Sequence, residues 1–325
     1  MQEEKLLEVK NLTIYYITDD VGTCKAVNHI NFSLGKSETL GLVGETGAGK
    51  TTIARGIMRL IPDPPGKIME GQILFHGQDL LKVKEKEIRK IRGNDISMIF
   101  QDPMTALNPT DTVGEQIAEV LKYQKRLSRK EAEKEAVKMM EMVGIPGERY
   151  GEYPHQFSGG MKQRIVIAIA LACKPELLIA DEPTTALDVT IQAQVLDMMK
   201  ELKSKLGTSM LLITHDLGVV AEMCDKVAVV YAGEVVEMGT AENIYDETAH
   251  PYTIGLFGSL PSMAGTEERL KPVEGMMPDP ADLPAGCKFA PRCPGKTKEC
   301  EKQEIGLTEI SDGHFVRCIH CGKER

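Results

Sequence analysis

The 325-residue sequence lacks three features that would each indicate a particular class of protein. Its longest apolar run, residues 165–173, is too short to cross a bilayer. The first thirty residues contain acidic side chains and no apolar core of the kind found in secretory signals. The net charge of -9 leaves no general surplus of basic side chains for binding nucleic acid over a broad surface. We therefore expect a cytosolic protein without nucleic acid as a partner. If it works at a membrane, another chain must hold it there.

Short apolar runs predict the fold class. A hydrophobic content of 42% and a charged content of 27% are ordinary for a soluble globular protein. Continuous apolar runs of four to five residues are typical of strands buried on both faces, as in a parallel sheet covered by helices. Such runs occupy residues 39–43, 97–100, 177–180, 210–214 and 227–231. We therefore expect an α/β fold, with half-buried strands at 6–16 and 26–34 and a closing hairpin around 232–237.

A mostly helical insert is expected between the second and third of these runs. Ser128 and Glu131 form the pattern of a capping box, which opens a helix that ends near Met142. A second helix is predicted at about 160–172. From about residue 250 the chain becomes rich in proline, glycine and cysteine, and we expect a domain boundary there.

Residues 44–51 read Gly-Glu-Thr-Gly-Ala-Gly-Lys-Thr, between a predicted buried strand and a helical pattern at 53–60. The three glycines allow the backbone to curl so that successive N–H groups face one anion. Lys50 adds a charge toward the β- and γ-phosphates, and the hydroxyl of Thr51 is a ligand for Mg²⁺. This loop predicts that the chain binds a nucleoside triphosphate.

An apolar strand that ends in two acids supplies what such a loop requires. The run 177–180 continues into Asp181, which is placed to hold Mg²⁺, and Glu182, which is placed to polarise the attacking water. Alone, this pattern is often a solvated strand end. Paired with the loop at 44–51, it indicates a site of nucleotide hydrolysis.

Three further features occur in a fixed order along the chain. Ser158, Gly159 and Gly160 stand at a predicted helix N-terminus and form a second candidate anion site. Gln101 follows a strand and would contact Mg²⁺ or the attacking water, and His215 ends a strand and would contact the γ-phosphate. Each feature alone is more often an ordinary helix cap or a hydrogen-bonded strand end.

Together, these motifs resemble the ATP-binding subunit of an ABC transporter over about residues 5–250. The resemblance implies a P-loop NTPase core with an antiparallel N-terminal β subdomain, a helical subdomain at about 101–172 and a D-loop at 185–188. The signature motif begins with Phe157 and has Met161 in fifth place, a departure found in the oligopeptide/dipeptide importer branch. Tyr16, or alternatively Tyr15, falls where the family stacks a ring on adenine.

The resemblance also implies the site residues. The residues expected to contact ATP are Tyr16, Gly44, Glu45, Thr46, Gly47, Ala48, Gly49, Lys50, Thr51, Thr52, Gln101, Asp181, Ser158, Gly159 and Gly160. Those expected to hold Mg²⁺ are Thr51, Gln101 and Asp181. Those expected to act in hydrolysis are Glu182, His215 and Gln101.

In the family, two such chains pair head to tail, so that the signature of one covers the γ-phosphate bound to the other. The resemblance therefore implies an identical or paralogous second ATPase subunit, two transmembrane permeases and an extracytoplasmic peptide-binding protein. It places the chain at the cytoplasmic face of the membrane as a peripheral subunit. The alternatives are import of another cargo such as nickel, a soluble ABC ATPase acting on DNA or ribosomes, and a protein whose tail is chiefly a redox sensor.

The tail at 251–325 resembles the C-terminal extension of oligopeptide/dipeptide transporter ATPases, with matches that include Leu260-Pro261. The predicted ligands of a [4Fe–4S] cluster are Cys287, Cys293, Cys300 and Cys318. Their spacing is not that of a zinc finger. Reduced thiols packed in a small core, or a zinc ion, are the alternatives. Cys321 is either a spare thiol or a substitute ligand.

Overall fold

The computed structural model describes residues 5–20, 22–185, 187–258 and 273–321. These residues form two compact units. Unit 1 comprises Leu34–Thr39 and Lys82–Ile213, and unit 2 comprises Lys5–Ser33, Leu40–Leu81 and the described part of the chain from Thr214 onward. Each unit is described by itself. Ala186 of the predicted D-loop and Leu260-Pro261 of the tail lie outside the described residues.

Unit 2 contains a four-stranded sheet in the order β2-β1-β4-β5, in which β1 pairs antiparallel with β4 and β4 with β5. Both β1 and β2 combine buried and exposed residues, and burial alternates along the second half of β2, which confirms the expected half-buried strands. The strands are β1 (Lys5–Thr18), β2 (Gly22–Gly35), β4 (Gly66–Phe75) and β5 (Gln78–Asp79).

A second group of strands in unit 2 carries the phosphate-binding loop. Here β3 runs parallel to β9, β9 forms a hairpin with β10, and β10 continues antiparallel into β12 and β11. The strands are β3 (Thr39–Val43), β9 (Lys226–Tyr231), β10 (Glu234–Thr240), β11 (Thr308–Ser311) and β12 (His314–Val316). The helices of this unit are α1 (Lys50–Ile57), α8 (Leu217–Met223), α9 (Ala241–Asp246), α10 (Pro251–Phe257), and the 3-10 turns Ala290–Arg292 and Lys298–Glu301.

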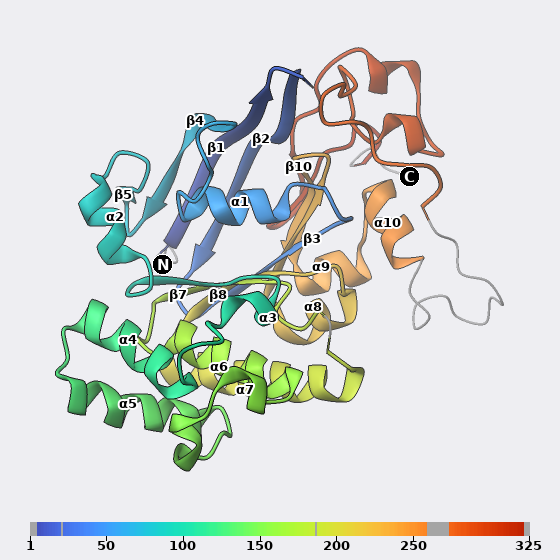
Figure 1. Ribbon diagram of the computed structural model, residues 1–325. Helices are drawn as coiled ribbons and strands as arrows, with labels where there is room; N and C mark the ends of the chain where they lie inside the picture. The colour runs from blue at the N-terminus through green and yellow to red at the C-terminus, as the bar shows by residue number, and fades with distance from the viewer. Residues whose placement is uncertain (1–4, 21, 186, 259–272, 322–325) are drawn as a thin grey trace. The chain divides into compact units, whose positions relative to one another are not determined.

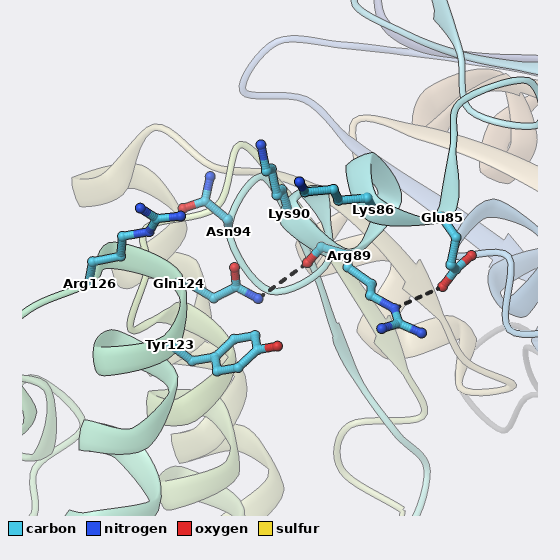
Figure 2. Close-up of a pocket in the computed structure, with 8 residues that line it drawn as sticks. All are labelled: Glu85, Lys86, Arg89, Lys90, Asn94, Tyr123, Gln124 and Arg126. Carbon is cyan, nitrogen blue, oxygen red and sulfur yellow. Dashed lines mark hydrogen bonds and ion pairs between the residues drawn. The ribbon is translucent and has the colours of Figure 1, made fainter.

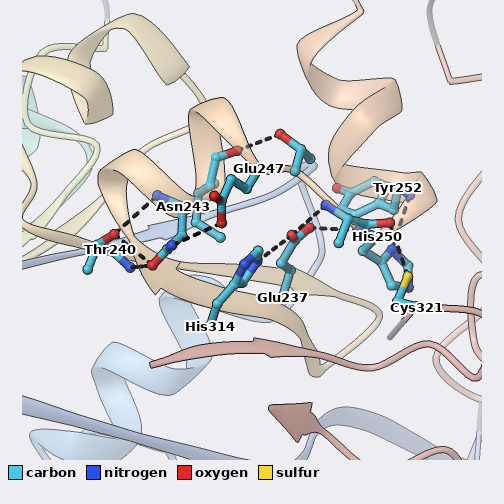
Figure 3. A network of polar contacts seen from close by, with 11 residues as sticks. Glu237, Thr240, Asn243, Glu247, His250, Tyr252, His314 and Cys321 are labelled. Atoms are coloured by element: carbon cyan, nitrogen blue, oxygen red, sulfur yellow. Dashed lines mark hydrogen bonds and ion pairs between the residues drawn. The ribbon is translucent and has the colours of Figure 1, made fainter. Parts of the chain in front are cut away.

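The tail is attached to β10 through a buried carboxylate (Figure 3). Oε1 of Glu237 lies 2.9 Å from Nε2 of His314 on β12, and both side chains are completely buried. The same carboxylate accepts the backbone N–H groups of Ala249, at 2.8 Å, and His250, at 3.0 Å, at the start of α10. A buried carboxylate without partners would destabilise the fold. The contacts of Glu237 therefore hold β10, β12 of the tail and the start of α10 together.

Unit 1 contains three parallel strands, β6 (Ile96–Ile99), β7 (Leu177–Asp181) and β8 (Ser209–Ile213), with every residue buried. Figure 1 shows α4–α7 of this unit, in green and yellow, gathered together. The capping box of Ser128 and Glu131 is present and opens α5, as predicted. The helices are α2 (Glu85–Ile91), α3 (Pro103–Ala106), α4 (Val113–Lys125), α5 (Arg129–Met142), α6 (Gly159–Leu171), α7 (Val189–Leu206) and the 3-10 turns Gly147–Gly151 and Pro154–Gln156.

The predicted α/β fold, its five buried strands and its closing hairpin are confirmed. Among the helices that the structure describes, none is both long and apolar enough to cross a membrane.

Candidate functional site: a nucleotide-binding loop and a paired carboxylate

The phosphate-binding loop follows β3 and leads into α1 in unit 2. Two of its glycines are required by their surroundings. A Cβ on Gly44, where φ is +148°, would lie 2.1 Å from the carbonyl oxygen of Val230, and one on Gly49, where φ is +104°, would lie 2.4 Å from that of Ala26. Any larger side chain at either position would displace the backbone that gives the loop its shape.

Lys50, the first residue of α1, is buried, with 6% of its surface exposed. Its ammonium group donates to the carbonyl oxygen of Gly44 at 2.6 Å and to that of Glu45 at 2.9 Å. Thr51 and Thr52 follow in the first turn of α1. The predicted charge is therefore held within the loop, where the more negative oxygens of a triphosphate would compete for it.

The predicted catalytic carboxylate lies directly after β7 in unit 1. Glu182 has a φ of +48°, an uncommon conformation for a residue with a side chain and one that recurs at functional sites. Its Oε2 accepts hydrogen bonds from Nε2 of Gln101, at 3.0 Å, and from Oγ1 of Thr185, at 2.9 Å. Asp181 ends the strand and is 2% exposed. Unit 1 thus brings Gln101, Asp181 and Glu182 to the ends of adjacent strands, as predicted for a hydrolytic site.

The predicted signature opens α6. Ser158 is the N-cap, and its Oγ accepts the N–H of Met161 at 3.4 Å. Among the described residues, a Cβ on Gly159 would meet no atom of another segment within 4 Å, whereas one on Gly160 would lie 2.5 Å from Cγ2 of Ile191. The two glycines therefore differ: Gly159 has open space before it, and Gly160 allows α6 to pack against α7.

Gln163 makes a buried hydrogen bond near the site that the sequence did not predict. It lies one turn into α6, is 1% exposed, and donates through Nε2 to the carbonyl oxygen of Pro183 at 2.5 Å. This bond joins the signature helix to the residue that follows Glu182. Because Gln163 stands between Lys162 and Arg164, nothing in the sequence distinguishes it as a buried residue.

The remaining predicted residues lie in unit 2. His215 is exposed and directly precedes Asp216, the N-cap of α8. Tyr15 and Tyr16 are both half-buried on β1, and a Cβ on Gly66 would lie 2.9 Å from Cε1 of Tyr16. Adjacent residues of a strand point to opposite faces, so only one of the two rings could serve as an adenine platform.

A cavity of about 840 Å³ lies between α2 and α4 in unit 1 (Figure 2). It contains none of the predicted site residues. Its lining residues are Glu85, Lys86, Arg89, Lys90, Asn94, Tyr123, Gln124 and Arg126.

The structure does not support the predicted iron–sulfur cluster. Within the described residues, no group of three or more His, Cys, Asp or Glu side chains is arranged to hold a metal ion. The Cys300 Sγ lies 3.5 Å from Nε2 of His320, and burial raises the pKa of Cys287 to about 11. A hydrogen bond from Cys321 lowers the pKa of Cys318 to about 6. Cys300 and Cys318 thus each have a polar neighbour outside the predicted set of four ligands.

Comparison with known proteins supports the assignment of these motifs. Residues 27–185 match the ABC transporter family, and residues 236–300 match the family described as "Oligopeptide/dipeptide transporter, C-terminal region". The second match includes the start of the tail, so both predicted parts of the chain have family counterparts.

Relatives resemble almost the whole chain. The dipeptide transport ATP-binding protein DppD of Bacillus subtilis is 53% identical over 317 residues, which cover 97% of this chain and 94% of the relative. The oligopeptide transport ATP-binding protein OppD of the same organism is 51% identical, covering 96% and 88%. The oligopeptide transport ATP-binding protein OppD of Haemophilus influenzae is 48% identical, covering 96% of both.

Among solved structures, the chain resembles the ATP-binding cassette MJ0796, in a dimeric post-hydrolysis state bound to ADP and Pi. The TM-score is 0.65 at 27% identity, with 72% of this chain and 98% of the cassette covered. Because these relatives match nearly the whole chain at about 50% sequence identity, this chain belongs to the family of ABC transporter ATP-binding subunits, in its oligopeptide/dipeptide importer branch.

Proposed function

We propose that this chain hydrolyses ATP to power the import of dipeptides or oligopeptides through an ABC transporter. The observation that carries the proposal is the similarity to dipeptide and oligopeptide transport ATP-binding proteins over nearly the whole chain, tail included. The contact between Gln101 and Glu182 supports the hydrolytic part.

The residues of the chain have separate roles in this proposal. Lys50 and the loop N–H groups bind the phosphates, and Tyr16 stacks on adenine. Thr51, Gln101 and Asp181 would hold Mg²⁺, which neutralises charge on the phosphates when bound. Glu182 orients the attacking water and accepts its proton, and His215 contacts the γ-phosphate.

The signature acts on a second chain. Ser158 caps α6 by accepting the N–H of Met161, and the open space at the Cβ position of Gly159 leaves room for an anion at this helix terminus. We propose that an identical or paralogous subunit pairs head to tail across this helix terminus, so that ATP links the two chains. A related cassette has been solved as a dimer, which supports this arrangement.

The other partners follow from the importer assignment. Two permeases would cross the membrane, and an extracytoplasmic peptide-binding protein would deliver the cargo to them. The chain itself would work as a peripheral subunit on the cytoplasmic face, with an ATPase domain at 1–250 and an extension at 251–325.

The test is uptake of labelled peptides by cells from which the gene has been deleted. Wild-type protein should restore uptake of a dipeptide or a short oligopeptide, and Glu182→Gln, expressed at the same level, should not. A labelled nickel salt and an unrelated amino acid serve as control cargoes. Restoration of nickel uptake without peptide uptake would contradict the peptide assignment.

A further inference from the structure

Arg292, in the 3-10 turn that precedes Cys293, reaches the phosphate-binding loop. Its Nη1 donates to Oε2 of Glu45 at 2.8 Å, and its Nη2 donates to Oε1 of the same carboxylate at 3.0 Å. The remaining donors reach the hydroxyl of Tyr231 at 3.4 Å and the carbonyl oxygens of Val273 at 3.1 Å and Glu274 at 2.8 Å. An arginine has five N–H donors, and all five are used here.

This ion pair is largely shielded from water. The Arg292 side chain is 5% exposed, and that of Glu45 is 30% exposed. The guanidinium carbon lies 5.8 Å from the ring centre of Tyr231 and 6.0 Å from that of Phe289. The bidentate geometry and the low exposure make the pair more than a solvent-exposed surface contact, whose contribution is usually small.

Glu45 connects this pair to the residue that faces the phosphates. The backbone N–H of Glu45 donates to the hydroxyl of Tyr252 at 2.9 Å. Its carbonyl oxygen accepts the ammonium of Lys50 at 2.9 Å and the N–H of Ala48 at 3.1 Å. Arg292 therefore acts on the loop through one residue whose side chain, N–H and carbonyl are all bonded.

Two further contacts place the tail against the same loop region. A Cβ on Gly47 would lie 3.2 Å from Cε of Met277. The carbonyl oxygen of Pro280 accepts the N–H of Lys25 on β2 at 2.8 Å. The segment 273–281 thus passes directly over the loop, and Arg292 anchors the start of this segment through Val273 and Glu274.

We propose that Arg292 is a positioning residue of the ATP site, which neutralises and holds the carboxylate of Glu45 so that the loop accepts a triphosphate. A carboxylate within a loop that binds phosphates repels the ligand unless a cation compensates its charge. The tail extension is then a working part of the nucleotide site as well as a separate module.

The test measures ATP affinity with a fluorescent ATP analogue, together with KM and kcat of ATP hydrolysis by the full-length protein. Arg292→Ala should raise the Kd and KM for ATP roughly tenfold, because Glu45 is left uncompensated, and should change kcat less than about twofold. Arg292→Lys keeps the charge but loses the five-donor guanidinium, so its KM for ATP should lie between those of the wild-type protein and Arg292→Ala.

The decisive variant combines Arg292→Ala with Glu45→Gln. If Arg292 acts by compensating Glu45, removing the carboxylate should restore most of the lost affinity, so that the double variant matches Glu45→Gln alone within about twofold. Arg317→Ala is the matched control. Arg317 is a tail arginine that donates to the carbonyl oxygens of Val235 and Ile305 and whose Nε lies 3.8 Å from Oε2 of Glu234. None of these three residues belongs to the loop.

Arg317→Ala should lower the Tm without raising the KM for ATP. The proposal is overturned if Arg292→Ala leaves ATP affinity unchanged, or if Glu45→Gln fails to rescue it. It is also overturned if Arg317→Ala raises the KM as much as Arg292→Ala does, since that result would assign the effect to general loosening of the tail. If Arg292→Ala does not fold, Arg292→Lys with and without Glu45→Gln provides the same comparison.

Discussion

Nε2 of Gln101 donates a hydrogen bond to Oε2 of Glu182 at 3.0 Å, although the two residues are 81 positions apart in the chain. Gln101 follows β6 and Glu182 follows β7, which are neighbouring parallel strands. The amide therefore holds the carboxylate proposed to orient the attacking water. This hydrogen bond gives a physical route between the segment after β6 and hydrolysis.

Glu182→Gln should preserve ATP binding and lower kcat by at least about a hundredfold, as expected for loss of a general base. The amide has the same shape as the carboxylate, so the backbone conformation at φ +48° should be unaffected. Nucleotide binding and single-turnover hydrolysis measure the two effects separately. Near-normal turnover would remove Glu182 from this role.

Lys50→Ala should give the opposite pattern. The ammonium group bonds two loop carbonyls and is proposed to bind the phosphates, so its removal should weaken ATP binding by roughly ten- to a hundredfold. A titration with ATP in the presence of Mg²⁺ checks this expectation. Unchanged affinity would mean that another group carries the phosphate charge.

Gly159→Asp should leave ATP binding by the isolated chain intact and prevent ATP-driven dimerisation. Its Cβ position is open, so the chain should fold, but the carboxylate would repel a phosphate approaching α6. Gly151→Asp is the matched control, because the Cβ position of Gly151 is likewise open in the part of the chain that the structure describes. Both substitutions are made in a chain that also carries Glu182→Gln, so that ATP is not consumed. Light scattering in the presence of ATP then measures the dimer.

Mixing gives a second check on the head-to-tail arrangement. Lys50→Ala and Gly159→Asp should each be nearly inactive alone, yet a mixture should regain ATPase activity, because one of the two shared sites combines an intact loop with an intact signature. A mixture as inactive as its components would contradict this arrangement.

The stability of the chain should fall in acid because of His250. Burial, with a further contribution from the charge of Arg317, lowers the pKa of His250 from 6.5 to about 3. Between pH 6.5 and about 3, the unfolded chain binds a proton at His250 and the folded chain does not. The free energy of unfolding therefore decreases by up to about 1.4 kcal/mol per pH unit as the pH falls through this range. His250→Asn keeps an acceptor for the N–H of Tyr252 and should show a shallower pH dependence in urea unfolding between pH 6.5 and 4. Equal slopes for the two proteins would contradict the assignment.

The five buried strands, the phosphate-binding loop and the capping box of α5 were predictable because each depends on residues close together in the chain. The Glu45–Arg292 and Glu237–His314 contacts join residues 247 and 77 positions apart, and no periodicity in the sequence indicates them. The tail strand β12 was also missed, since it has only three residues and pairs with β10 far along the chain.

The cysteines show the limit of reading chemistry from residue type. Spacing indicated that the thiols of Cys287, Cys293, Cys300 and Cys318 could share a metal, but ligation depends on where the side chains point. In the described part of the tail, Cys300 lies beside His320 and Cys318 beside Cys321. The neighbouring positions of Cys318 and Cys321 are visible in the sequence, but the approach of His320 to Cys300, 20 positions earlier, is not.

The most direct test of the account follows peptide uptake and phosphate release together in vesicles that contain this chain, its permeases and the peptide-binding protein. The account predicts that wild-type chain imports peptide only when Mg²⁺ and ATP are present on the side of the chain, and that Glu182→Gln loses import and phosphate release together. Peptide import that continues in the Glu182→Gln vesicles without phosphate release would contradict it.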